Sequence, residues 1–470
     1  MATLCTKKSL EQDLDKFRST FEFDTTNLDT DRVRTLIRKL EDDQKNTTKS
    51  KDENRKIIHF LSYLYFRLDD HKHALQLIEV SLQEDPDNII ANANKARILL
   101  ENGKDSEVEK IISRLQDLEI QNDYDKRKCY AEADLAYAYA RSGPWYYQRA
   151  VDLYSRLVEA YPSEYAWQFG LGLTLLRQTH HVHSRADVEN EKTTLDAAER
   201  LLAATKSDDP ILSAKAYAEL GRAVYNIEKR KYGDLPPHIK KLRYKDCFKK
   251  ALEICSEEPS VLQICGQYAR YSLDFDESET LLRKALQKKP TPQSYHHLAL
   301  TLAKMVEMPG GHSTERNRPE ESGDEDGFIC VGGKKRKRPN QTMKSPLKVQ
   351  VYPGNSLLKE AIELIDKAEE LDSNILNIQY DKGILYRMLG ETANAVEVFK
   401  QIISKRKSFP TKTVMTYAEE QLRFCLLELD DSKEIPPDKK RKYENDDQSQ
   451  PFLWNRYSTL QEPSSDESDG

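Results

Sequence analysis

The sequence predicts an all-α fold in which pairs of helices repeat along the chain. Three observations support this prediction. The 470 residues include only 17 glycines and 19 prolines, too few for the turns of a β-rich protein. Charged residues make up 32% of the chain, as expected when many helices expose one face. Small and large apolar residues also recur with a period of about 34 residues. Together these features favour one solenoid over the roughly three globular domains that the length alone suggests.

The repeat is typical of tetratricopeptide units. Each unit has two antiparallel helices, with small residues where the helices cross and large apolar residues between neighbouring helices. Proline often follows the second helix because it cannot continue it. The predicted fold is therefore a tetratricopeptide-repeat superhelical solenoid of about eight helix pairs with a concave groove. The residues that mark the units, in order, are Leu61 and Ala74; Ala96 and Val108; Ala138 and Ala150; Trp167 and Ala198; Tyr217 and Tyr244; Gly266 and Ala285; Leu298 and Ala361; and Gly383 and Phe399.

Two segments lack helical periodicity. Residues 306–353 combine an acidic stretch around Asp324 with the basic run Lys334–Arg338, and the end of the chain carries a second basic run, Lys439–Lys442. Such compositions bury too little apolar surface to offset the entropy of ordering, so we expect a disordered insert and a disordered C-terminal tail. The predicted organisation is an N-terminal helical segment (1–54), repeats 1–6 with the first helix of repeat 7 (55–305), the insert (306–353), the second helix of repeat 7 with repeat 8 and a capping helix near Val414–Leu429 (354–430), and the tail (431–470).

Composition and the N-terminal residues narrow the function classes. No run of about 18 apolar residues occurs, so no membrane span is expected, and Met1–Leu10 has no apolar core of a signal peptide. The seven cysteines are scattered without a CxxC pair, which predicts a reduced, cytoplasmic chain without structural zinc. The net charge of −6 argues against a protein that coats nucleic acid through its overall field. Any nucleic-acid site would have to be a local basic cavity.

No sequence motif predicts catalysis. The phosphate-binding, nucleophile-elbow, zinc-protease and dinucleotide-binding motifs are all missing, so we expect a protein that is not an enzyme and needs no cofactor. His180, His181 and His183 lie together but lack spaced partner ligands, which favours a solvated loop over a metal site. For the pair His296 and His297 we expect one ring to pack in the core and the other to face the groove.

Basic and aromatic residues on the first helices of the units are candidates for ligand binding. Arg177 closes one such helix, and Arg270 stands between Tyr268 and Tyr271 on another. First helices line the concave face of this kind of solenoid, where arginines can hold phosphates and tyrosines can stack on bases. The same residues are also compatible with ordinary polar groove positions or with salt bridges to neighbouring helices. The pattern leaves these alternatives open.

Several stretches of the chain resemble a known family. The matching stretches are Leu10 to Phe21, Arg32-Val33, Leu61-Ser62-Tyr63, Ala131-Glu132, Tyr147-Gln148-Arg149-Ala150, Leu281 to Leu286, His296-His297 and Ala303-Lys304-Met305. In this order they resemble the interferon-induced proteins with tetratricopeptide repeats, which are antiviral RNA-binding proteins of vertebrates. The resemblance covers residues 9–305 and, more loosely, 355–428.

The resemblance implies a site for the 5′ end of single-stranded RNA in a basic tunnel. Arg32, Arg177 and Arg270 match phosphate-contacting arginines of the family, His297 matches a groove histidine, and Tyr147 matches a tunnel tyrosine. The chain departs from the family at three positions. Ala140 replaces an expected lysine (Arg141 stands beside it), Gln263 replaces an arginine, and Leu298 replaces a glutamine. These changes remove charge-assisted hydrogen bonds from a triphosphate pocket.

Two functional hypotheses follow. The first is a non-enzymatic RNA-binding solenoid of the innate antiviral type, with phosphates at Arg32, Arg177 and Arg270 and bases stacked on Tyr268 or Tyr147. The alternative is a scaffold that binds protein partners through the concave groove, which the net charge and the replaced cations favour.

The two basic runs bear on localisation. Lys334–Arg338 and Lys439–Lys442 have the composition of nuclear-import or nucleic-acid patches, so nuclear entry is a further expectation for a chain that is otherwise expected in the cytoplasm. Runs of this kind are equally compatible with plain solvated loops.

Overall fold

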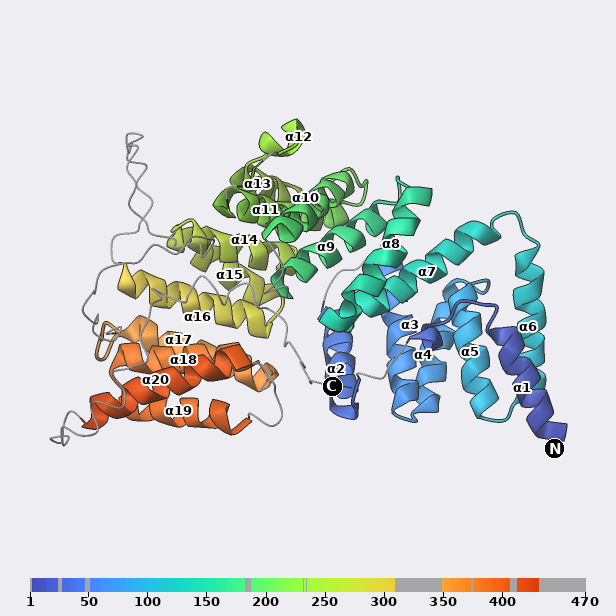
Figure 1. The fold of residues 1–470 in the computed structure, drawn as a ribbon, viewed down its shortest axis with the longest axis horizontal. Coiled ribbons are helices and arrows are strands. Elements are labelled where there is room, and N and C mark those ends of the chain that lie inside the picture. Colours follow the sequence, from blue (N-terminus) through green and yellow to red (C-terminus); the bar gives the residue numbers. More distant parts are fainter. Residues whose placement is uncertain are drawn as a thin grey trace, which may run out of the picture. The chain divides into compact units, whose positions relative to one another are not determined.

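The computed structural model describes residues 2–23, 28–46, 51–181, 187–230, 232–233, 235–308, 349–372, 375–405 and 412–430. Within these ranges every regular element is a helix (Figure 1). The all-α fold class predicted from the sequence is therefore confirmed. None of the described helices is long and apolar enough to cross a membrane.

The helices follow one another in antiparallel pairs, as the repeat predicts. The eight pairs within the described ranges are α3 (Lys51–Arg67) with α4 (His71–Glu84), α5 (Ile89–Glu101) with α6 (Asp105–Glu119), α7 (Tyr124–Arg141) with α8 (Tyr147–Ala160), α9 (Tyr165–His181) with α10 (Asp187–Ala204), α11 (Pro210–Arg230) with α13 (Tyr244–Ile254), α14 (Pro259–Tyr271) with α15 (Phe275–Lys288), α16 (Pro292–Glu307) with α17 (Ser356–Leu371), and α18 (Leu376–Leu389) with α19 (Thr392–Ser404). Outside the pairs are α1 (Ala2–Leu14), the short helix η1 (Thr20–Glu22), α2 (Thr30–Asn46), the short helices η2 (Pro144–Tyr146) and α12 (Pro237–Lys240), and α20 (Lys412–Asp430), which lies where the sequence predicts a capping helix.

Local sequence signals set where several helices begin and end. The side chain of Asn88 accepts a hydrogen bond from the amide of Ala91 and so caps α5. Thr291 caps α16 in the same way, by accepting from the amide of Ser294, and a proline follows it in the first turn. Gly390 ends α18 in the left-handed conformation, with φ of 82°, which glycine adopts without a steric penalty.

Small residues allow the two helices of a pair to approach closely. A Cβ atom added to Gly221 on α11 would lie 2.5 Å from the ring of Phe248 on α13. The same holds for Gly383 on α18, where a Cβ would lie 2.5 Å from the ring of Phe399 on α19. Real Cβ atoms essentially never come so near, so the glycines are required at these crossings. The structure thus confirms the packing that the repeat predicts.

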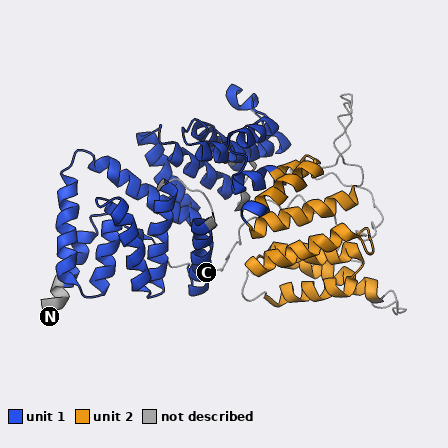
Figure 2. Ribbon diagram, turned by 180° about the vertical axis from the view of Figure 1, so that it is seen from behind, with its two compact units in different colours: residues 1–265, 287–289 blue, residues 266–286, 290–470 orange. Residues whose placement is uncertain are grey.

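The chain divides into two compact units (Figure 2). Unit 1 comprises residues 1–265 and 287–289, and unit 2 comprises residues 266–286 and 290–470. Each unit has its own buried apolar core. Phe60 and Trp167 are fully buried in unit 1, and Ile365 and Phe399 are fully buried in unit 2.

The predicted insert is described only at its two ends. Residues 306–308 belong to or directly follow α16, while Val349 and Tyr352 pack against the core of unit 2. The amide of Tyr352 donates a hydrogen bond of 2.7 Å to the carbonyl of Met388. Residues 309–348 and 431–470, with the basic runs Lys334–Arg338 and Lys439–Lys442, lie outside the described residues. Disorder in the insert and tail, and the localisation function of the runs, stay predictions.

Candidate functional site

The six predicted site residues are divided between the two units. Arg32 on α2, Tyr147 on α8 and Arg177 on α9 belong to unit 1. Tyr268 and Arg270 on α14 and His297 on α16 belong to unit 2.

In unit 1, three arginines meet at the C-terminal end of α7. Nη2 of Arg32 donates to the carbonyl oxygen of Ser142 at 2.8 Å, and Nη1 of Arg177 donates to that of Ala140 at 3.3 Å. Arg141, from the same turn, pairs with Asp43 at 2.7 Å. We call Arg32, Arg141 and Arg177 the arginine cluster. The last carbonyls of a helix have no partner within the helix and form the negative end of its dipole, so they attract guanidinium groups.

The electrostatic effect of the cluster reaches a neighbouring tyrosine. Burial raises the pKa of Tyr137 on α7, and the positive charge of Arg141 opposes that rise. Arg32 and Arg177 are partly exposed, so solvent reaches both groups. The cluster therefore brings three guanidinium groups to one helix end, and two of these side chains, Arg32 and Arg177, are partly exposed.

The two predicted stacking tyrosines are covered by protein. Tyr147 is 1% exposed and Tyr268 is 2% exposed. The ring of Tyr268 lies edge-on to Tyr271, with centroids 5.1 Å apart. Stacking on a base requires an open ring face. The base-stacking function of Tyr147 and Tyr268 stays a prediction.

In unit 2, Arg270 and His297 contact each other inside the protein. A guanidinium nitrogen of Arg270 lies 3.4 Å from Nδ1 of His297, and the guanidinium covers the ring of Tyr271 at 5.0 Å. His296 stacks on His297 and bonds to Asp381 through Nε2 at 2.7 Å. Both histidines are buried, so the expectation that one of them faces the groove is wrong. Each ring has a polar partner within the helical packing, which makes burial of both possible.

A buried charge network in unit 1 was not predicted from the sequence. The side chain of Asp134 on α7 is almost fully buried and is held by both Nη2 and Nε of Arg55, at 3.0 and 3.3 Å. Nδ1 of His59 lies 2.7 Å from Asp134, and Nε2 of His59 lies 2.7 Å from the hydroxyl of Ser81. Burial by itself would raise the pKa of Asp134, but the charge of Arg55 and hydrogen bonds from His59 and Arg55 hold it well below its ordinary value.

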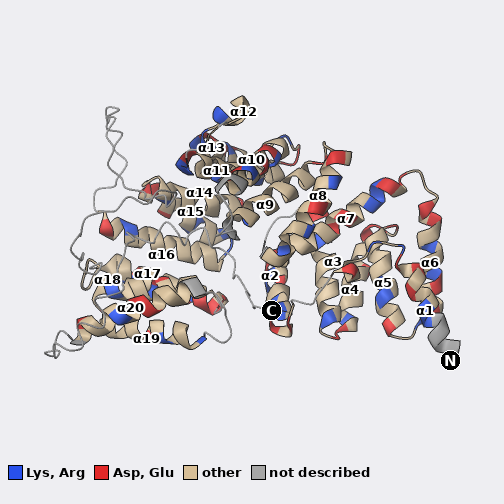
Figure 3. Cartoon of the chain, in the orientation of Figure 1, with Lys and Arg blue, Asp and Glu red and all other residues tan. Residues whose placement is uncertain are grey.

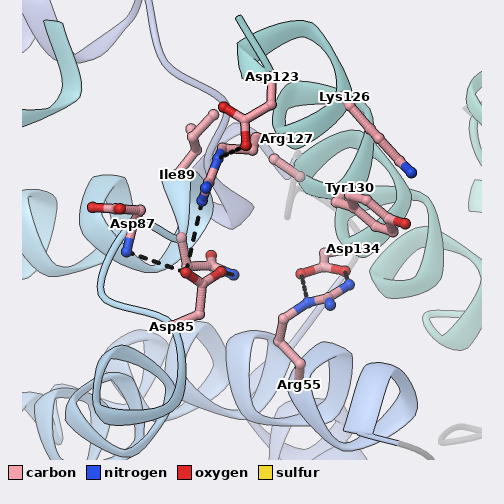
Figure 4. Close-up of a pocket in the computed structure, with 11 residues that line it drawn as sticks. Arg55, Asp85, Asp87, Ile89, Asp123, Lys126, Arg127, Tyr130 and Asp134 are labelled. Carbon is pink, nitrogen blue, oxygen red and sulfur yellow. Dashed lines mark hydrogen bonds and ion pairs between the residues drawn. The ribbon is translucent and has the colours of Figure 1, made fainter. Parts of the chain in front are cut away.

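The network borders an open pocket of about 350 Å³ in unit 1 (Figure 4). Arg55 and Asp134 form one wall, and Tyr130 stands beside them with the guanidinium of Arg55 5.5 Å from its ring centre. On the opposite side, Arg127 pairs with Asp123 at 2.8 Å and with Asp85 at 3.8 Å. The pocket therefore presents both signs of charge and one aromatic ring.

Ser81, His59 and Asp134 are hydrogen-bonded in the order found in serine hydrolases. Ser81, however, is 3% exposed within α4 and is not among the residues that line the pocket. A nucleophile must reach its substrate, so this arrangement joins α3, α4 and α7 rather than presenting a reactive hydroxyl. Separate helices supply the three residues, which explains why no short sequence motif revealed them.

Metal ligation finds no support in the described parts of the chain. No group of three or more His, Cys, Asp or Glu side chains there is arranged to hold a metal ion. The side chains of His180, His181 and His183 lie outside the described residues, so their placement in a solvated loop stays a prediction.

Comparison with known proteins agrees with this architecture. The model of the tetratricopeptide repeat family matches residues 133–191, which include the second half of α7, all of α8 and α9, and the start of α10. A comparison with curated protein sequences found no match.

Three solved structures of IFIT1 are similar to this chain. The human IFIT1 dimer with m7Gppp-AAAA is 14% identical, with a TM-score of 0.58 over 92% of this chain and 88% of that chain. The human IFIT1 dimer with PPP-AAAA is 13% identical, with a TM-score of 0.56 over 92% and 88%. A monomeric IFIT1 mutant with Gppp-AAAA is 14% identical, with a TM-score of 0.57 over 92% and 89%. The matched repeat and these likenesses together show that the chain has the tetratricopeptide-repeat fold.

Proposed function

We propose that this protein is a non-enzymatic binder of single-stranded RNA and that the arginine cluster of unit 1 contacts RNA phosphates. The convergence of Arg32, Arg141 and Arg177 on one helix end carries the proposal. Guanidinium groups form strong, charge-assisted hydrogen bonds to phosphate. A guanidinium carries five N–H donors in a planar fork, and a bond to a main-chain carbonyl fixes the orientation of that fork.

Two further observations support RNA as the ligand. Arg32 and Arg177 are the two unit 1 positions that match phosphate-contacting arginines in the family that the sequence resembles. The similar IFIT1 structures contain the RNA ligands m7Gppp-AAAA and PPP-AAAA. The buried position of Ser81 supports the non-enzymatic part of the proposal, because the hydroxyl of the Ser81-His59-Asp134 arrangement is closed to a substrate.

Reversing the charge of Arg177 tests the proposal. We expect Arg177→Glu to raise the Kd for a 20-nucleotide single-stranded RNA with a 5′-triphosphate by at least tenfold, about 1.4 kcal/mol. The loss of its bond to Ala140 should lower the free energy of unfolding by only about 1 kcal/mol. Fluorescence anisotropy gives the affinity, and urea unfolding gives the stability.

The matched control is Arg200→Glu, on α10 of the same unit. The Arg200 side chain is 37% exposed and pairs with Asp196 one turn away, so its reversal changes the net charge by the same amount outside the cluster. Equal RNA affinity for wild type and Arg177→Glu, or an equal loss in Arg200→Glu, contradicts an RNA site at the arginine cluster.

Peptide binding is a second candidate, favoured by the mixed charges of the pocket beside Tyr130. Asp85, Asp87 and Asp123 would repel RNA phosphates there, whereas a peptide with both acidic and basic side chains can pair with both signs. Panning a displayed peptide library against wild type and against Tyr130→Ala tests this candidate. Peptides that wild type retains and Tyr130→Ala loses support it; equal retention by both proteins contradicts it.

A further inference from the structure

A basic surface of unit 1 lies at the end of α11, on α12 and α13, and on the residues that join α12 to α13, separate in sequence from the arginine cluster on α2, α7 and α9. We call it the basic face. Its residues are Lys229, Arg230, Lys240, Lys241, Arg243, Lys245, Lys249 and Lys250, and the side chains of all of them are exposed. Lys and Arg positions are marked in blue on α12 and α13 in Figure 3.

The basic face is built on an enlarged connection between the two helices of a pair. α11 ends at Arg230 and α13 begins at Tyr244. In the first pair, by comparison, α3 ends at Arg67 and α4 begins at His71 after a short turn. α12 lies within this connection, and its Ile239 is only 2% exposed in the core of unit 1. The connection is therefore fixed by an apolar contact.

α13 separates apolar from basic side chains. Cys247, Phe248 and Ala251 are buried on the side that packs against the unit. Lys245 and Lys249, one turn apart, are exposed on the other side. Like charges at this spacing repel each other and lower the stability of the helix, so folding stability does not explain the two lysines.

Carboxylates balance only part of this charge: Glu228 on α11 and Asp246 and Glu253 on α13 are exposed beside the eight lysines and arginines. Glu253 pairs with Lys249, but only at 4.0 Å. Among the described residues, no carboxylate lies within ion-pair distance of Lys240, Lys241, Lys245 or Lys250. By contrast, Lys215 on α11 of the same unit pairs with two carboxylates, those of Glu53 and Glu258.

Aromatic rings lie at the edge of the basic face. The ammonium group of Lys229 lies 5.6 Å from the ring centre of Tyr225, and Tyr225 meets Tyr244 edge-on with centroids 5.2 Å apart. Both tyrosines are partly exposed. Lysines that track a phosphate backbone beside aromatic rings are the combination that binds single-stranded nucleic acid without sequence preference.

We propose that the basic face is a second, sequence-independent binding surface for the phosphate backbone of single-stranded RNA. The inference rests on the proposed function only in taking RNA as the ligand, and it does not require the arginine cluster. Exposed ammonium groups without bound carboxylates hold counterions that RNA phosphates displace, and the release of these ions drives binding. This surface recognises backbone charge and not the chemistry of the 5′ end.

The test uses the full chain and a matched pair of quadruple variants. The first variant combines Lys240→Glu, Lys241→Glu, Lys245→Glu and Lys250→Glu. The control combines Lys72→Glu, Lys110→Glu, Lys128→Glu and Lys206→Glu, which are exposed lysines spread over unit 1. Both variants change the net charge equally. The probe is a 20-nucleotide oligouridine with a 5′-hydroxyl, measured by fluorescence anisotropy from 50 to 300 mM salt.

We expect the basic-face variant to lose at least tenfold in affinity at the lowest salt. The slope of log K against log salt should become shallower by about 3, because each of four lost phosphate contacts contributes roughly 0.7. The control should stay within about twofold of wild type. Unchanged binding by the basic-face variant, or an equal loss in the control, overturns the inference.

Two further measurements distinguish RNA from an unspecific polyanion and the basic face from the arginine cluster. Polyglutamate of the same charge should displace the RNA far less well than unlabelled oligouridine, and equal displacement overturns RNA as the partner. Arg177→Glu is measured in parallel. If Arg177→Glu binds normally while the basic-face variant fails, the RNA contact proposed for the arginine cluster is contradicted and this inference stands. The reverse result overturns this inference alone.

Discussion

Arg55 and Asp134 form a bidentate ion pair that joins α3 to α7, in which the Asp134 side chain is buried and the Arg55 side chain is 21% exposed. Nη2 of Arg55 also reaches Asp52 at 2.6 Å, so one guanidinium holds two carboxylates. Removing one member of such a pair leaves the other charged and desolvated, which costs far more than the pair itself contributes. The ion pair therefore holds α3 against α7 in unit 1, and replacing Asp134 tests this contact.

Asp134 should make the stability of the protein sensitive to acid. Its pKa is lowered on folding, so its contribution is fully present above the unfolded pKa of about 3.9 and is lost as the pH falls towards the folded pKa. We expect Asp134→Asn to lower the free energy of unfolding at pH 7 by about 3–5 kcal/mol. The variant should also lose less stability than wild type below about pH 4. Urea unfolding between pH 2.5 and 7 measures both effects. Asp125→Asn, at an exposed position on the same helix, is the control and should leave the pH profile unchanged.

Ser81 should be chemically inert despite its bond to His59. Its hydroxyl is buried, so a fluorophosphonate probe should leave the native protein unlabelled while labelling a serine hydrolase under the same conditions. Ser81→Ala should instead reduce stability by about 1–3 kcal/mol, because a buried ring nitrogen of His59 loses its partner. Mass spectrometry of the probe-treated protein is the measurement. A label that disappears in Ser81→Ala would show that the hydroxyl is reactive.

Gly266 should be intolerant of a larger side chain. A Cβ at this position would lie 2.8 Å from Cγ of Leu282 and 3.3 Å from Cβ of Leu281. Gly266→Leu overpacks the crossing of α14 and α15, and we expect a loss of roughly 1–3 kcal/mol in the free energy of unfolding. Thr280→Leu adds the same side chain at an exposed position of α15 and should cost much less. Thermal melts of both variants compare them, and equal midpoints would contradict the close crossing.

Arg387 should hold the last helix in place. It is 3% exposed on α18, and its guanidinium donates to Gln421 and pairs with Glu428, both on α20. Arg387→Ala leaves α20 with fewer contacts, so we expect faster proteolysis within 412–430 than in wild type. Lys367→Ala on α17 is a surface control. Limited proteolysis followed by mass spectrometry locates the cuts, and an unchanged cleavage pattern would show that apolar packing alone holds α20.

The repeat pattern predicted the fold because its information is local. Gly266 and Leu282 belong to one helix pair, so a small residue and the large residue that packs against it occur within a single repeat. Asn88, Thr291 and Gly390 likewise set helix ends through bonds to residues a few positions away. The stacking of pair on pair then follows from the apolar faces that each repeat leaves uncovered.

The functional surfaces required the tertiary structure. Arg32 is 110 positions from Ser142, and Arg177 is 37 from Ala140, so no periodic pattern could bring these arginines to one helix end. The burial of Asp134 depends on the packing of three helices, and the residues next to it in the sequence do not indicate that it is buried.

The all-α architecture, the eight helix pairs and the positions of the small residues follow from the repeat pattern, because each repeat contains the residues that it buries. The concentration of lysines and arginines between 229 and 250 was also readable in the sequence, although composition alone does not say where they point. The three-dimensional packing was needed to show that they face solvent, that Arg32, Arg141 and Arg177 converge, and that His296 and His297 are both buried. A side chain's charge environment depends on groups from several helices, and packing between repeats, not the pattern inside one repeat, brings those helices together.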